Sequence, residues 1–145
     1  MNKTKKLQTR FLAVIISLVM CITILPLNIA KAAETLTVYV SISQGGEFVT
    51  SKDGEAVAYQ KIEVTDVNGN GSYDVADVLY TAHEEFYEGG AAAGYSDYES
   101  TWGLSLGTLW GDSSGAFGYR VENGEVYVSS LETEVKDGYY VHAYV

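Results

Sequence analysis

Twelve residues, 66–77, carry the clearest chemical pattern in the chain, DVNGNGSYDVAD. Oxygen-bearing groups recur along this stretch, at Asp66, Asn68, Asn70, Ser72, Asp74 and Asp77. Calcium is a hard cation that takes about six to eight oxygen ligands, whereas zinc and redox metals favour Cys and His. The stretch contains neither Cys nor His. The pattern therefore predicts a calcium site built from these residues.

The spacing fits an EF-hand-type loop, which takes ligands from positions 1, 3, 5, 7, 9 and 12. Asp66 is position 1, Asp77 is position 12, and Gly71 stands at position 6, where the chain must turn sharply. The loop resembles most closely those of dockerin modules, which share the Asp-x-Asn-x-(Asp/Asn)-Gly opening and an Asp at position 12. A dockerin has two such loops and this chain has one, so the resemblance does not extend to cohesin binding.

The affinity expected of this loop is low. Tyr73 occupies position 8, where EF-hand loops usually carry an aliphatic residue, and the last ligand is a short Asp. We expect a dissociation constant of about 10⁻⁴–10⁻³ M, the range of extracellular modules.

Part of the same stretch also suits a role without an ion. Asp74 is a good N-cap for a following helix, and Asp77 would lie in its first turn, where a carboxylate is favourable. A cap, however, needs none of Asp66, Asn68 and Asn70, and clustered aspartates repel one another unless a cation is present. We favour the calcium site, and the simple cap stays open as the alternative.

Other reactive residue types form no catalytic set. A zinc-peptidase motif would need a second His four residues after His83, where the chain has Tyr87. We therefore expect His83, Glu84 and Glu85 on a solvated helix face. No Ser or Cys stands in a nucleophile-elbow setting. The sequence predicts a protein that is not an enzyme.

An aromatic stretch, residues 95–119, offers a second functional hypothesis. Trp102, Trp110 and Tyr119 lie in it among many Gly and Ser residues. Such rings can stack on a flat small molecule or a sugar, which would make the protein a ligand-binding module. Packing in the core is their more ordinary role.

The first 32 residues read as a secretory signal peptide. A basic start, MNKTKK, precedes the apolar run FLAVIISLVMCITILPLNIA, and the small residues Ala30 and Ala32 precede a cleavage site after Ala32. An uncleaved membrane anchor is the alternative, which Pro26 disfavours. We expect a secreted, extracellular protein consisting of residues 33–145.

The composition of residues 33–145 excludes several classes of protein. They contain no cysteine, so a disulfide framework is excluded. Five of the nine basic residues precede position 33, which leaves four against nineteen acidic ones and a net charge of −15. This charge disfavours nucleic acid and anionic membranes as partners and leaves cations and neutral ligands open.

Hydrophobic patterning predicts one α+β domain. Residues 35–42 alternate as a half-buried strand, and residues 47–65 read as a short strand, a turn and a longer strand. Apolar residues at helical spacing predict a helix over 75–88, with Asp77 among the residues facing solvent. Gly89 and the glycine after it would end this helix.

The later part of the chain is less regular until its end. Residues 103–111, GLSLGTLWG, could form a short helical turn that buries Leu106, Leu109 and Trp110. Asn123-Gly124 predicts a two-residue hairpin turn. Residues 139–145 read as a final strand.

The stretch LWGDSSGAFGYRVENGEVYVSSLETEVKDGYYVHAYV resembles the C-terminal half of a bacterial extracellular domain. That domain is similar to the C-terminal domain of transcobalamin and occurs in surface proteins of Gram-positive bacteria. The matching features are Phe117–Tyr119, the Asn123-Gly124 hairpin and Lys136–Gly138, and the resemblance covers most of residues 35–145. It implies a β-grasp-like mixed sheet packed against one main helix. It does not imply cobalamin binding, because no ligand residue matches.

Together these patterns predict a secreted, non-enzymatic module whose calcium ion fixes a strand-to-helix junction. Its expected partners are the calcium ion and an extracellular ligand or cell-surface protein.

Overall fold

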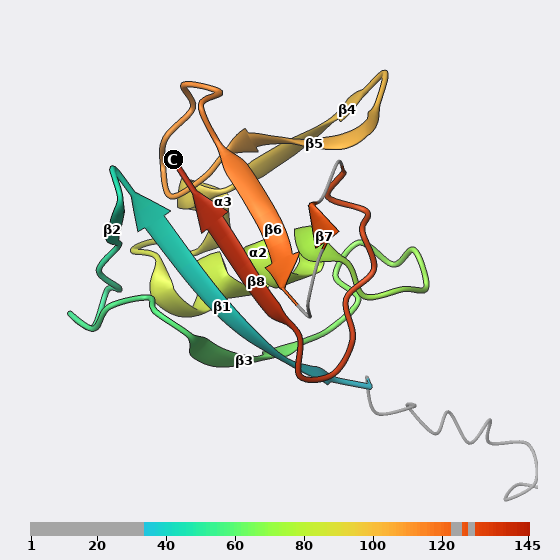
Figure 1. Ribbon diagram of the computed structural model, residues 1–145, viewed down its shortest axis with the longest axis horizontal. Coiled ribbons are helices and arrows are strands. Elements are labelled where there is room, and N and C mark those ends of the chain that lie inside the picture. The colour runs from blue at the N-terminus through green and yellow to red at the C-terminus, as the bar shows by residue number, and fades with distance from the viewer. Residues whose placement is uncertain (1–33, 123–125, 128–129) are drawn as a thin grey trace, which may run out of the picture. The chain divides into compact units, whose positions relative to one another are not determined.

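The chain divides into two units, Met1–Ala32 and Ala33–Val145. The structure, a computed structural model, describes residues 34–122, 126–127 and 130–145, all in the second unit (Figure 1). The predicted signal peptide and the predicted Asn123-Gly124 turn lie outside the described residues. No helix in the described ranges is long and apolar enough to cross a membrane.

A mixed sheet forms the centre of the second unit. Its strands are β1 (Leu36–Gln44), β2 (Glu47–Phe48), β3 (Gln60–Val64), β6 (Gly118–Glu122), β7 (Val126–Tyr127) and β8 (Tyr140–Tyr144). β1 pairs antiparallel with β2 and β3, and parallel with β8. β8 pairs antiparallel with β6, which pairs antiparallel with β7. The first and last strands are thus parallel neighbours, and the predicted α+β, β-grasp-like fold is confirmed.

The main helix, α2 (Val75–Phe86), covers one face of this sheet. In Figure 1 the strands β1, β8 and β6 lie in front of α2. Strand alternation turns Val38, Val40 and Ile42 of β1 toward the helix, and all three are fully buried. The predicted helix is confirmed, although it ends at Phe86, because Tyr87 adopts an extended conformation.

The predicted helical turn over 103–111 is wrong. Residues Gly103–Thr108 form β5, which pairs antiparallel with β4 (Ser96–Ser100) in a separate two-stranded sheet. The alternation Leu104-Ser105-Leu106 is strand-like, and the Ser100 hydroxyl closes the hairpin by donating to the Gly103 carbonyl at 2.6 Å. A short helix, α3 (Ala91–Gly94), precedes β4.

Two residues predicted to face solvent from the helix are buried instead. His83 is 0% exposed and Asp77 is 1% exposed. The acidic residues Glu84, Glu85 and Glu88 are exposed as expected. Segments from the C-terminal half of the chain pack on His83 and Asp77, and helical spacing alone does not reveal such contacts.

Candidate metal centre

The loop 66–77 connects the end of β3 to the start of α2. Asp74 is the N-cap of the helix, and its Oδ1 accepts a hydrogen bond from the Asp77 backbone N–H at 3.1 Å. Asp77 Oδ2 in turn accepts from the Asp74 backbone N–H at 3.1 Å. These reciprocal bonds form a capping box, which satisfies two donors that a helix start leaves open. The predicted N-cap role of Asp74 is confirmed.

A distant segment covers this helix start. The Val75 and Ala76 backbone N–H groups donate to the carbonyls of Thr133 (3.1 Å) and Leu131 (3.0 Å). On the other side, the Val135 N–H donates to the Tyr73 carbonyl at 2.9 Å. Residues 130–135 therefore lie across the junction of loop and helix. This cover explains why Asp74 is 0% exposed and Asp77 only 1% exposed.

Asp77 also closes the loop onto the helix. Its Oδ1 accepts hydrogen bonds from the backbone N–H groups of Val67 (2.9 Å) and Asn68 (3.4 Å). Burial raises the pKa of the Asp77 carboxyl, and the nearby charge of Asp74 raises it further, while the bonded N–H groups oppose the rise. Both oxygens of Asp77 thus already accept backbone donors, so this residue holds the loop in shape.

The side chains of Asn68 and Asn70 converge on Asp74. Their amide nitrogens donate to the same carboxylate oxygen, Asp74 Oδ2, at 3.1 Å and 2.9 Å. The oxygen and nitrogen of an amide have nearly the same shape, so a half-turn of each side chain exchanges them. After that half-turn, two carbonyl oxygens would stand beside the carboxylate oxygen, and the bonds that these oxygens now accept from the Asn70 and Ser72 N–H groups would be lost. Such a group of oxygens suits a hard cation.

Hydrogen bonds to the side chains of Asp66 and Asn70 hold the first half of the loop. The Asp66 carboxylate accepts from the backbone N–H groups of Asn70 (3.1 Å) and Gly71 (2.9 Å). Asn70 Oδ1 accepts from both the N–H and the hydroxyl of Ser72, each at 2.8 Å. Gly71 has a φ of 88°, a left-handed conformation that favours glycine, as expected at position 6.

Among the described residues, the buried carboxylates of this site, Asp74 and Asp77, have no ion pair with Lys or Arg. In the same ranges, no three His, Cys, Asp or Glu side chains are grouped to hold a metal ion. An ion in this loop would therefore depend on the oxygens of Asn68, Asn70 and Ser72 as much as on the carboxylates.

The aromatic residues of the second hypothesis lie on separate elements. Trp102 is 87% exposed in the turn between β4 and β5. Trp110 follows β5 and packs its ring 4.9 Å from that of Tyr87 on the helix end. Tyr119 lies in β6, half-buried against the core, and this burial raises the pKa of its hydroxyl. Within the described part of the chain, no ring contact joins these three residues.

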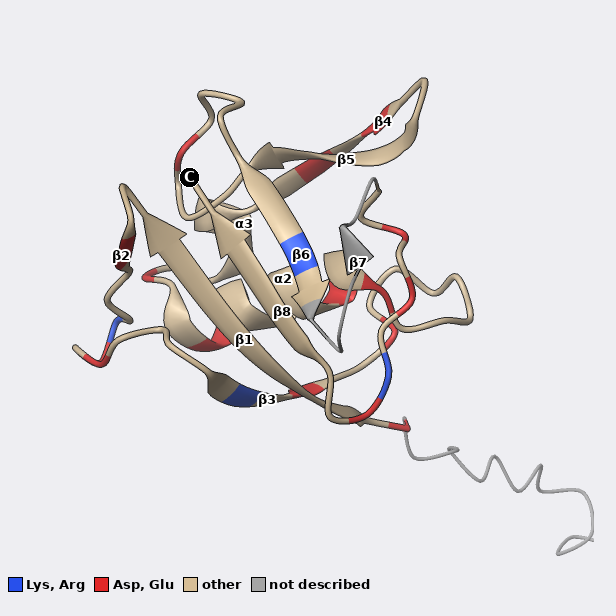
Figure 2. Ribbon diagram, in the orientation of Figure 1, with Lys and Arg blue, Asp and Glu red and all other residues tan. Residues whose placement is uncertain are grey.

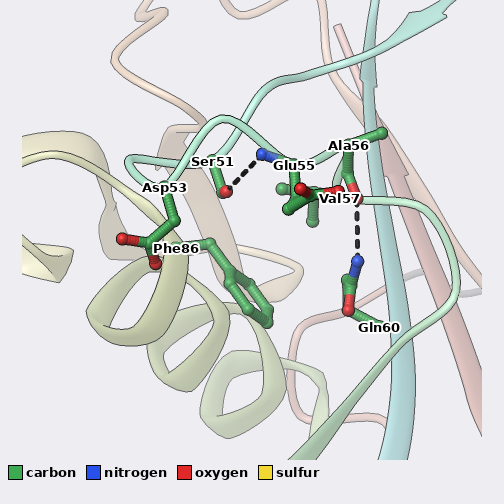
Figure 3. Close-up of a pocket in the computed structure, with 7 residues that line it drawn as sticks. All are labelled: Ser51, Asp53, Glu55, Ala56, Val57, Gln60 and Phe86. Atoms are coloured by element: carbon green, nitrogen blue, oxygen red, sulfur yellow. Dashed lines mark hydrogen bonds between the residues drawn. The ribbon is translucent and has the colours of Figure 1, made fainter.

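A small pocket lies away from the loop, beside the C-terminal end of α2 (Figure 3). Its volume is about 150 Å³. It is lined by Ser51, Asp53, Glu55, Ala56, Val57, Gln60 and Phe86. The Ser51 hydroxyl accepts from the Glu55 N–H at 3.2 Å, and Gln60 donates to the Ala56 carbonyl at 2.9 Å. None of the residues predicted to bind a metal or ligand lines it.

No family model and no curated protein matches this chain.

Proposed function

We propose that the protein is a secreted, non-enzymatic extracellular module that binds one structural calcium ion in the loop 66–77. One observation carries the proposal. Two neighbouring carboxylates, Asp74 and Asp77, are almost completely buried, and no ion pair within the described ranges joins either of them to Lys or Arg. Burying adjacent like charges is costly, and a divalent cation offsets that cost.

The donors of the loop favour calcium over other metals. Asp66, Asn68, Asn70, Asp74 and the Ser72 carbonyl supply oxygen only, which a hard cation prefers. Asp77 completes the set, because its carboxylate oxygens keep lone pairs that are not used by the hydrogen bonds from backbone N–H groups. The ion would join the end of β3 to the start of α2, so we assign it a structural role.

The surroundings of the loop support the same role. Residues 130–135 are hydrogen-bonded to the junction of the loop and the helix. An ion bound in the loop would therefore stabilise the loop, the helix start and residues 130–135 together. The resemblance to extracellular domains of Gram-positive surface proteins fits such a module. The alternative, a ligand-binding module that uses residues 95–119, stays a prediction; the exposure of Trp102 supports it.

Thermal unfolding with and without calcium tests the proposal. At about 10 mM calcium and a dissociation constant of about 10⁻⁴–10⁻³ M, linkage gives a stabilisation of about 1.4–2.7 kcal/mol. For a domain of this size, the melting temperature should rise by roughly 5–10 °C. Magnesium at the same concentration should give a smaller rise, because it demands a tighter octahedral site.

Matched variants locate the effect. Asp66→Ala should abolish most of the calcium-dependent rise, whereas Glu99→Ala removes an exposed carboxylate of β4 and should leave the rise intact. An unchanged melting temperature in calcium, or an equal rise in Asp66→Ala, would reject the calcium site.

A further inference from the structure

An aromatic surface crosses the face of the sheet that lies opposite α2. We call it the aromatic platform, and its members come from β1, β2, β8 and the residue before β3. They are Tyr39, Phe48, Tyr59, Tyr140, His142 and Tyr144. Alternation along β1 and β8 turns their rings away from the helix, because the alternate residues Val38, Val40 and Ile42 of β1 and Val141 and Ala143 of β8 face the core.

The rings of the platform contact one another in a continuous series. Tyr59 stacks on Tyr39 with centroids 4.7 Å apart and lies 5.1 Å from Tyr140. His142 follows, 6.3 Å from Tyr140 and 5.8 Å from Tyr144. Phe48 lies 6.3 Å from His142 on the other side. The series therefore runs along the length of the β1–β8 pair.

Tyr59 occupies its place on the platform in an unfavourable backbone conformation. Its φ is 54°, a left-handed value that is rare for an aromatic residue. The Ser41 hydroxyl fixes this conformation by accepting the Tyr59 N–H at 2.7 Å. Tyr59 packs its ring against Tyr39 and Tyr140, and the residue still stays 61% exposed. A strained backbone that holds a largely exposed aromatic residue in place points to a function of that residue.

Hydrogen-bonding groups accompany the rings. Four members are tyrosines, and the imidazole of His142 contacts the Ser43 hydroxyl at 3.0 Å and Arg120 Nη2 at 3.4 Å. No aliphatic side chain stands on this face between Tyr39 and Ser43 of β1 or along β8. Every ring of the platform except Phe48 combines an apolar ring face with a hydroxyl or a ring nitrogen, which suits a ligand that has both an apolar face and polar edges.

The charge around the platform also restricts the ligand. Figure 2 shows β1 and β8 without charged residues, a basic residue on β6, and both a basic and an acidic residue on β3. The basic residues are Arg120 and Lys61, and Lys61 is paired with the acidic residue, Glu63, at 3.0 Å. The six members of the platform carry no carboxylate, and Glu63 at the β3 edge is paired with Lys61, on a domain of net charge −15. The rings themselves therefore offer a cation no carboxylate, and the net charge repels a polyanion such as nucleic acid.

We propose that the aromatic platform binds a neutral oligosaccharide chain. A pyranose ring has an apolar C–H face that stacks on aromatic rings, and hydroxyls at its edge that bond to polar groups such as the phenol hydroxyls of the exposed Tyr59 and Tyr144. Successive sugars would stack along the series from Tyr39 to Tyr144. This site is distinct from the calcium loop and from residues 95–119.

Isothermal titration calorimetry with two neutral probes tests the proposal. The probes are hexasaccharides of β-1,4-linked glucose and of β-1,4-linked N-acetylglucosamine, and at least one should bind saturably. Tyr59→Asn removes the ring while Asn tolerates the left-handed backbone, so affinity should fall about tenfold with little change in melting temperature. Tyr140→Ala should weaken binding similarly, and it serves if Tyr59→Asn does not fold.

Two control variants and one acidic probe give the outcomes that would contradict the proposal. Tyr98→Ala removes an exposed tyrosine of β4, and Trp102→Ala removes the exposed Trp of the turn between β4 and β5; neither should change affinity more than about twofold. The proposal is overturned if neither neutral probe binds, or if Trp102→Ala abolishes binding and Tyr59→Asn does not. Tighter binding of a galacturonic acid hexamer than of both neutral probes would overturn the neutral ligand class. Chelator is present throughout, so the outcome does not depend on the calcium site.

Discussion

His83 Nε2 accepts a hydrogen bond from the Trp110 backbone N–H at 3.0 Å and thereby joins α2 to the segment after β5. An acceptor nitrogen carries no proton, so the proton lies on Nδ1, which donates to the Leu79 carbonyl at 2.6 Å. The ring also packs within 5.8 Å of the rings of Tyr87 and Tyr95. His83 is therefore a neutral, fully satisfied core residue.

The neutral state of His83 predicts a loss of stability in mild acid. Burial lowers the pKa of this imidazole from 6.5 to about 4. The unfolded chain binds the proton more readily, so the free energy of unfolding should fall as the pH drops from 6.5 to 4, by about 3 kcal/mol from this group. Denaturant unfolding across this pH range measures the fall.

A substitution separates His83 from other titrating groups. Asp77 acts in the opposite sense, because its raised pKa favours protonation in the folded state as the pH falls. In His83→Gln the amide oxygen can still accept the Trp110 N–H, but nothing titrates. Between pH 6.5 and 4, the free energy of unfolding should fall more steeply with pH in the wild type than in His83→Gln. Parallel curves for the two proteins would contradict the prediction.

Removing the His83 ring should be strongly destabilising. His83→Ala leaves a cavity among aromatic rings and an unsatisfied Trp110 N–H, so we expect a loss of about 2–4 kcal/mol in the free energy of unfolding. Glu85→Ala, on the exposed side of the same helix, should stay within about 0.5 kcal/mol. Equal losses in the two variants, measured by urea unfolding, would show that the contact with Trp110 contributes nothing.

A close approach between Tyr87 and Gly94 gives a third prediction. A Cβ at position 94 would lie 2.6–2.8 Å from three carbons of the Tyr87 ring, although the backbone there is not left-handed. Gly94→Ala should therefore cost about 1–3 kcal/mol through overpacking alone. In a Tyr87→Ala background the same substitution should cost much less, and an undiminished cost would exclude the clash as its cause.

Local patterns in the sequence were sufficient for much of the fold. The alternation in residues 35–42 and the helical spacing after Asp74 predicted β1 and α2, because each pattern reflects which side of the element meets the core. The cap at Asp74 was also predictable, because its hydrogen bonds join residues within a stretch of four.

Contacts across long distances in the chain were not predictable in this way. The burial of Asp77 depends on residues 130–135, and that of His83 depends on Trp110, neither of which has a local signal. The aromatic platform was missed because its rings are contributed by strands that are neighbours only in the folded sheet. The positive φ of Tyr59 likewise follows from its bond to Ser41 and has no mark in the sequence.

Asp74→Ser separates the two roles of Asp74, capping the helix and binding an ion. Serine caps a helix about as well as aspartate, and its introduction removes the charge that raises the pKa of Asp77. The substitution also removes the oxygen that accepts the Asn68 and Asn70 amide N–H groups, so in chelator the free energy of unfolding should stay within about 1 kcal/mol of wild type. In about 10 mM calcium the variant should gain almost nothing, whereas the wild type should gain about 1.4–2.7 kcal/mol. Calcium-dependent thermal unfolding of both proteins measures the two effects together. A large loss in chelator, combined with an unchanged gain in calcium, would show that Asp74 acts only as a cap and that any bound ion lies elsewhere.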